Sequence, residues 1–233
     1  MQILEQKRLM IEGIPAIRWG KASDKVYIFV HGKMSVKESA KSFAEIADSK
    51  GYQVLSFDLP EHGERSDHSY RCDIWNGMTD LGSIAKYAKA NWSNISLFGC
   101  SLGAYFSLMA YKEEPMERCL FLSPILDMQQ LIGKMFQWFQ VSEEQLKDKL
   151  EIPTPIDTLR WDYYSFVKEH PIEHWDIPTK ILYGSCDELQ DLTVMEDFTQ
   201  KFHGHLTVAE GCNHAFDGKE QALRVVQWLL QNI

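Results

Sequence analysis

The sequence predicts an α/β fold in which a mostly parallel central sheet is flanked by helices. Two observations predict it. Short continuous apolar segments alternate with longer amphipathic ones, which is the pattern of parallel strands covered by helices on both faces. His31, Asp58, Ser101, Asp187 and His214 all lie just beyond the ends of predicted strands. Ligands bind at the carboxyl ends of the strands in such sheets, so a functional site is expected there.

The first half of the chain predicts a hairpin followed by alternating strands and helices. Gly13 separates two short apolar stretches, and Gly51 follows a helical pattern at a position typical of a helix end. The predicted strands are Arg8–Ile11, Ile14–Trp19, Val26–Val30, Gln53–Phe57 and Ile95–Phe98. The predicted helices are Lys37–Ser49, Ile74–Asn91 and Leu102–Glu113.

The second half continues the alternation, with an insertion over residues 124–176. The predicted strands are Cys119–Leu122, Lys180–Tyr183 and Leu206–Val208, and the helices are Leu192–Phe202 and Gln221–Leu230. Within the insertion, Lys134–Phe139, Ser142–Leu150 and Thr158–Glu169 have helical patterns. Pro153 and Pro155 interrupt them, because proline breaks a helix.

Length, composition and charge limit the possible functions. The chain has 233 residues, 45% hydrophobic and 24% charged, values typical of a globular chain forming one domain over residues 1–233. The net charge of −9 argues against nucleic acid and anionic lipid as partners. We see no apolar run of about 18 residues and no leader pattern, and the five cysteines suggest free thiols, so we expect a cytoplasmic location.

The sharpest motif is Gly99-Cys100-Ser101-Leu102-Gly103, between a predicted strand and a predicted helix. This is the setting of a nucleophile elbow, a turn so tight that larger side chains two residues from the serine would collide. The helix that begins at Leu102 points its first amides at the site, where they stabilise developing negative charge. The motif therefore predicts Ser101 as a nucleophile.

With this motif and the order of elements, the chain resembles the α/β-hydrolase superfamily, in particular its compact bacterial esterases and serine-aminopeptidase-like members. The catalytic triad of this family runs serine, acid, histidine along the chain. Gly184-Ser185-Cys186-Asp187 resembles the acid loop, and Gly211-Cys212-Asn213-His214 resembles the histidine loop. The resemblance implies that His214 deprotonates Ser101 and that Asp187 orients His214.

Alternatives to the acid remain open at this stage. Asp187 is also a candidate helix cap, and Glu188 or Asp191 could replace it. Some hydrolases of this fold carry the acid after the preceding strand, which here points to Asp127.

His31-Gly32-Lys33-Met34 resembles the family's oxyanion-hole segment. The resemblance implies one backbone N–H from Leu102 and another from Lys33 or Met34. It also makes the side chains or backbone of His31, Gly32, Met34 and Cys100 candidates for substrate contact. In the Asp58–Ser66 loop, Asp58 and His62 are expected to be buried hydrogen-bonding residues rather than catalysts.

In this family an insertion such as 124–176 forms a small helical cap before the acid-bearing strand. Trp138 and Trp161 are candidate substrate contacts, although the aromatic residues of the insertion are expected mainly to pack the cap onto the body. These aromatic residues are Phe136, Trp138, Trp161, Tyr163 and Tyr164. A cap this short suggests a short or medium acyl group.

The predicted function is hydrolysis of a carboxylic ester through an acyl-enzyme. A thioesterase, an amidase or an aminopeptidase would use the same triad, and a non-catalytic ligand-binding member of the fold is a further alternative. We expect no cofactor, because no glycine-rich phosphate loop is present, and no metal, because no cysteines have C-x-x-C spacing. Cys100, Cys186 and Cys212 are expected to be small buried side chains.

Overall fold

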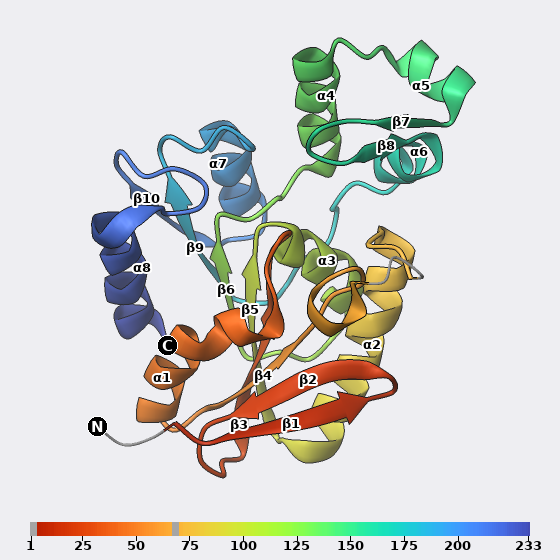
Figure 1. The fold of residues 1–233 in the computed structure, drawn as a ribbon. Coiled ribbons are helices and arrows are strands. Elements are labelled where there is room, and N and C mark those ends of the chain that lie inside the picture. Colours follow the sequence, from red (N-terminus) through yellow and green to blue (C-terminus); the bar gives the residue numbers. More distant parts are fainter. Residues whose placement is uncertain (1–3, 67–69) are drawn as a thin grey trace.

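The computed structural model describes residues 4–66 and 70–233, and its core is an eight-stranded sheet in the order β1-β2-β4-β3-β5-β6-β9-β10 (Figure 1). The strands of this sheet are β1 (Gln6–Ile11), β2 (Ile14–Trp19), β3 (Lys25–Val30), β4 (Gln53–Phe57), β5 (Asn94–Cys100), β6 (Cys119–Leu122), β9 (Thr179–Gly184) and β10 (His205–Ala209).

The sheet is mostly parallel, as the sequence predicts. Only the β1–β2 hairpin and its pairing with β4 are antiparallel. The chain runs from β3 to β4 on one side and then returns to β5 on the other side of β3. This reversal places the carboxyl ends of β3 and β5 at the topological switch point, where sheets of this kind bind ligands.

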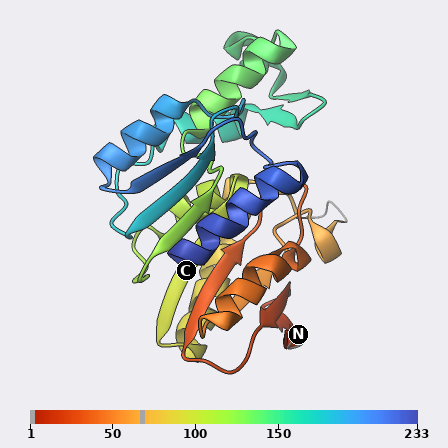
Figure 2. The same ribbon diagram turned by 90° about the vertical axis from the view of Figure 1, so that its left-hand side faces the viewer.

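Helices cover both faces of the sheet. Helices α1 (Lys41–Ser49) and α8 (Gly218–Asn232) lie side by side on one face (Figure 2). Helices α2 (Ile74–Asn91) and α3 (Leu102–Tyr111) pack together, and α7 (Leu192–Lys201) contacts β10. Strand β3 shows the two faces directly, because Val26 and Ile28 join one buried cluster while Tyr27 and Phe29 join the other.

The segment between β6 and β9 lies at one end of the molecule (Figure 1). It contains α4 (Met128–Phe139), α5 (Glu143–Lys149), β7 (Glu151–Pro153), β8 (Thr158–Arg160) and α6 (Trp161–Glu169). The helix predicted from Thr158 instead starts at Trp161. The backbone N–H of Thr154 donates to the carbonyl of Asp157, which closes a turn and pairs β7 with β8 as a small hairpin.

Other boundaries differ by a few residues. The predicted helix from Lys37 begins with a 3₁₀ turn over Lys37–Ala40 before α1, and a second 3₁₀ turn covers Gly63–Arg65. Helix α3 ends at Tyr111 rather than Glu113. In the described ranges, no helix combines the length and apolar character that a membrane span needs.

The first residue after β4, Asp58, organises the loop that follows. Its side chain is fully buried and accepts hydrogen bonds from the backbone N–H of Lys37 at 2.9 Å, the ammonium of Lys37 at 2.7 Å and the backbone N–H of Glu64 at 3.0 Å. Lys37 is itself only 2% exposed. The prediction that Asp58 is a buried hydrogen-bonding residue is therefore confirmed, whereas His62 is half-buried.

We expect Asp58→Asn to lower the free energy of unfolding by about 1.5–3 kcal/mol, because it removes the fully buried carboxylate bound to Lys37 and leaves this charge with the more exposed Glu38 and Glu64. Urea unfolding followed by circular dichroism measures this loss. Glu38→Gln is the matched control, since its carboxylate pairs with Lys37 and Arg8 but is 42% exposed and should contribute about 0–1 kcal/mol. Equal effects of the two variants would contradict the role given to Asp58.

Candidate active site

Ser101 lies in the turn between β5 and α3, with backbone angles φ 49° and ψ −118°. A non-glycine residue at positive φ costs on the order of 1–3 kcal/mol and persists only where the surroundings enforce it. Here the Ser101 N–H donates to the carbonyl of Leu122 at 3.1 Å, and its carbonyl accepts from Ala104 at 3.0 Å. The turn places the serine hydroxyl at the carboxyl ends of the strands.

The glycines on either side of Ser101 are required by close contacts. A Cβ atom on Gly103 would lie 2.4 Å from the carbonyl oxygen of His31 and 2.5 Å from that of Val30. A Cβ atom on Gly99 would lie 2.9 Å from the ring of Phe121. The first turn of α3 thus packs directly against the end of β3, as the elbow motif predicts.

The structure brings Ser101, His214 and Asp187 together from separate loops. His214 Nε2 lies 2.9 Å from Ser101 Oγ, and His214 Nδ1 lies 2.7 Å from Asp187 Oδ2. Asp187 is 8% exposed, and its other oxygen accepts from the backbone N–H of Leu189 at 2.8 Å. A carboxylate on Nδ1 holds the proton on that nitrogen, which leaves Nε2 free to accept the serine proton.

The alternative acids have other contacts. Asp127 is the N-cap of α4 and accepts from the backbone N–H of Gln130 at 2.8 Å. Asp191 pairs with the ammonium of Lys134 at 2.8 Å. Glu188 is exposed. Among these candidates, Asp187 alone hydrogen-bonds to His214 in the structure.

Several residues that hold the loops in place were not found by sequence reasoning. The Ser123 hydroxyl donates to the His214 carbonyl at 2.7 Å, and the Gln221 side chain accepts from the Asn213 N–H at 2.9 Å. Gln190 is fully buried and links its own loop to Leu126 and Asp127. The contacts of Ser123 and Gln190 join segments that lie far apart in the sequence. The only sequence signal was the position of Ser123 directly after a strand.

The structure separates two of the expected substrate contacts in the segment after β3: His31 borders a cavity that also contains Ser101, whereas Met34 does not. The ring of His31 is 1% exposed, its Nε2 accepts from the Leu59 N–H at 3.1 Å and its Nδ1 lies 2.7 Å from the Gly32 carbonyl. Burial lowers the pKa of His31 to about 4, so the ring is neutral at pH 7 and braces the loop. Met34 instead points into solvent and is 93% exposed.

The backbone N–H groups of Lys33 and Met34 differ in whether they already have a hydrogen-bond partner. The N–H of Met34 donates to His62 Nε2 at 3.0 Å, so it is already occupied. In the described ranges, the N–H groups of Lys33 and Leu102 have no hydrogen-bond partner. Both residues line the same cavity as Ser101, and these two amides are therefore available to an oxygen beside the serine.

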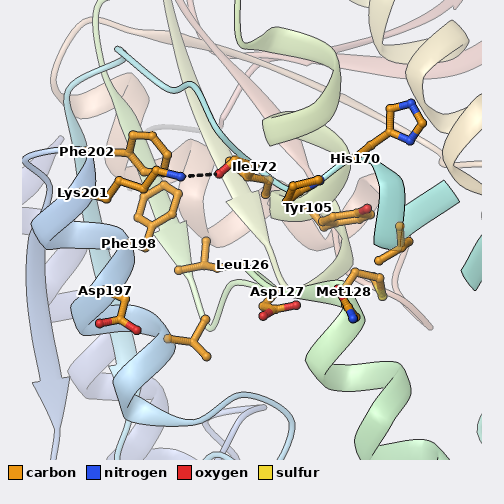
Figure 3. A pocket seen from close by; sticks show the side chains of 14 residues that line it. Tyr105, Leu126, Asp127, Met128, His170, Ile172, Asp197, Phe198, Lys201 and Phe202 are labelled. Carbon is orange, nitrogen blue, oxygen red and sulfur yellow. Dashed lines mark hydrogen bonds between the residues drawn. The ribbon is translucent and has the colours of Figure 1, made fainter. Parts of the chain in front are cut away.

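Ser101 lies between two cavities. One, of about 140 Å³, lies under the insertion and includes Leu102, Ile132 and Trp138 in its lining. The other is a crevice of about 460 Å³ between α1 and α8 that includes Gly32, Cys100 and His214. A further cavity of about 240 Å³, between Tyr105 and Phe198, does not reach Ser101 (Figure 3).

The remaining candidates are Trp161 and the cysteines near the site. Trp161 lines neither cavity at Ser101; it packs on Tyr164 with ring centres 6.1 Å apart, which corrects its assignment as a substrate contact. Burial and the nearby Asp187 raise the pKa of the Cys100 thiol to about 12, so it stays protonated. Cys212 is buried as expected, whereas Cys186 is exposed.

Comparison with known proteins shows the α/β-hydrolase fold. No family model matches the chain, and no curated protein is similar to it in sequence. Among solved structures, Est1E from Butyrivibrio proteoclasticus with ferulic acid bound has a TM-score of 0.79 at 18% identity, over 97% of this chain and 96% of that one. Mouse alpha/beta hydrolase domain-containing protein 10 has a TM-score of 0.74 at 17% identity, over 97% and 96%. The Pyrococcus furiosus esterase Pf2001 has a TM-score of 0.69 at 19% identity, over 98% and 90%.

We expect Gly103→Ala to destabilise the protein by about 1–3 kcal/mol, because the new methyl group must displace the end of β3. Gly82→Ala is the matched control. Gly82 lies inside the exposed face of α2 with no atom within 4 Å of the added Cβ, so this change should stabilise by about 0.5–1 kcal/mol. Thermal unfolding of both variants tests the pair, and a neutral Gly103→Ala would refute the close packing.

Proposed function

We propose that this chain is a serine hydrolase that cleaves a carboxylic ester of a short or medium acyl group through an acyl-enzyme. The observation that carries the proposal is the continuous hydrogen-bonded line from Ser101 Oγ through His214 to Asp187 Oδ2. The fold shared with the Pyrococcus furiosus esterase Pf2001 supports the same class.

In the proposed reaction, Ser101 Oγ attacks the ester carbonyl carbon while its proton passes to His214 Nε2. The carbonyl π electrons move onto the oxygen to give a tetrahedral oxyanion. When the carbonyl re-forms, the bond to the leaving oxygen breaks and His214 returns the proton to it, which releases an alcohol. Water then attacks the acyl-enzyme with the same histidine as base, and yields the acid and free Ser101.

Two backbone amides and one carboxylate would stabilise the charges that develop during the reaction. The free N–H groups of Leu102 and Lys33 are the proposed donors to the oxyanion, and donors fixed in advance need no reorganisation during the reaction. Asp187 would stabilise the imidazolium of His214. Its own position is fixed by the backbone N–H of Leu189, so the histidine ring is held in one orientation.

We further propose that residues 124–176 act as a cap within the single domain 1–233. The cavity under this insertion has apolar walls that include Ile125, Met128 and Met135, and it contains Ser101. At about 140 Å³ it lies below the roughly 300–1,000 Å³ common for pockets of drug-sized ligands. This small volume supports a short or medium acyl group.

A fluorophosphonate probe tests whether Ser101 is activated. We expect one covalent adduct on the native protein and none on Ser101→Ala, read by intact mass. The phosphorus mimics the attacked carbonyl, so labelling requires both an activated hydroxyl and oxyanion donors. A folded native protein that gains no adduct would instead favour a non-catalytic ligand-binding member of the fold.

The choice of acid predicts a large difference between two similar substitutions. Asp187→Asn should lower kcat for a soluble butyrate ester by about 10⁴-fold, because an amide favours the wrong histidine tautomer. Asp127→Asn is the matched control, since Asp127 caps α4 and should leave kcat within about twofold of wild type. The opposite ranking would transfer the acid role to Asp127.

A further inference from the structure

The two cavities that meet at Ser101 differ in one respect that matters for the reaction. The crevice between α1 and α8 is lined by His214, whereas the cavity under the insertion is not. Both contain Ser101 and Lys33. Ser101 therefore borders both cavities, whereas His214 borders only the crevice between α1 and α8.

The chemistry of acylation fixes which part of an ester lies on which side. His214 Nε2 must give its proton to the leaving oxygen as the C–O bond breaks, and a proton donor has to lie within hydrogen-bond reach of its acceptor. The alcohol portion of the ester therefore occupies the side of Ser101 that carries His214. The acyl chain extends to the other side.

Building on the proposed function, we propose that the crevice between α1 and α8 binds the alcohol portion of the substrate, and that this portion is an extended apolar group. The cavity under the insertion then receives the acyl group. The preferred substrate class is a short or medium acyl ester of an alcohol larger than methanol or ethanol.

The walls of the crevice fit an apolar chain. Its floor is formed by Phe29 and Phe98, whose rings stack with centres 4.7 Å apart. Ile46 of α1 and Leu229 of α8 line the sides. Among the described residues that line it, Lys33 is the only one with a permanent charge, and its ammonium is paired with Asp157.

The volumes of the two cavities also support this assignment of the alcohol and acyl portions. The crevice measures about 460 Å³, against about 140 Å³ for the cavity under the insertion. Only the crevice lies in the range of about 300–1,000 Å³ that is usual for small-molecule sites. Its rim carries small residues that include Ser42 on α1 and Ala222 on α8, both exposed, so a chain can enter between the two helices.

The test compares hexyl butyrate with methyl butyrate, which differ only in the alcohol. Native protein that labels with the fluorophosphonate probe should show kcat/KM at least about tenfold higher for the hexyl ester, because the added methylenes are buried. Ala222→Trp and Ser42→Trp each place a large ring at the rim, one from each wall. Each should lower the hexyl-to-methyl ratio by about tenfold.

Two further variants serve as controls. Gln227→Trp adds the same ring to an exposed position of α8 that does not line the crevice, and it should keep the wild-type ratio. Leu131→Trp fills the cavity under the insertion, and it should lower the ratio for methyl hexanoate over methyl acetate while sparing the hexyl-to-methyl ratio. Circular dichroism checks that each variant is folded.

The outcomes separate this inference from the function on which it rests. Absence of probe labelling on the native protein would overturn the proposed hydrolase itself. Labelling with equal rates for hexyl and methyl esters would overturn only the alcohol crevice. A hexyl-to-methyl ratio that falls in Leu131→Trp and not in the two rim variants would reverse the assignment of the two cavities.

Discussion

Helix α3 can start where it does only because position 103 has no side chain. The Gly103 backbone lies against the carbonyl groups that end β3, and a single added methyl carbon would come within 2.4 Å of one of them. Two residues earlier, in the turn between β5 and α3, Ser101 has φ 49°. Helix α3 begins directly after this turn, so the Leu102 N–H has no intrahelical partner, as at every helix start. One steric constraint therefore places both the hydroxyl that we propose as the nucleophile and a backbone amide beside it.

A second close approach positions the other two residues of the site. A Cβ atom on Gly184, the last residue of β9, would lie 2.4 Å from the carbonyl oxygen of Cys212. The loop carrying Asp187 can thus lie directly on the loop carrying His214. The backbone N–H of Cys186 donates to the same Cys212 carbonyl at 2.8 Å, and the hydroxyl of Ser123, the residue after β6, donates to the His214 carbonyl. These contacts hold the two loops together, and the Asp187 carboxylate hydrogen-bonds to His214 Nδ1 at 2.7 Å between them.

Much of this arrangement could be predicted from the sequence, because it is encoded locally. A continuous apolar segment such as Val26–Val30 indicates a buried strand, and a glycine at position 99 indicates a tight turn at Ser101. The residues that sequence reasoning misplaced depend on packing partners. Trp161 packs on Tyr164 instead of lining either cavity at Ser101, and the strand at Thr158–Arg160 exists because it pairs with Glu151–Pro153. Short segments with mixed propensity take the structure that their tertiary partners impose.

The Asp58–Ser66 loop, which follows β4, supports the segment that carries Lys33 through a series of contacts. The buried carboxylate of Asp58 anchors this loop to Lys37 and accepts the backbone N–H of Glu64 within the loop. From the same loop, His62 accepts the N–H of Met34, and this bond fixes the peptide that follows Lys33. The Lys33 side chain is held on its other side by Asp157 of the insertion. A free amide is useful to a developing oxyanion only if it is already aimed, because reorienting it during the reaction would cost free energy. In the proposed function the backbone of Lys33 is an oxyanion donor, and its long side chain ties that donor to the insertion through Asp157.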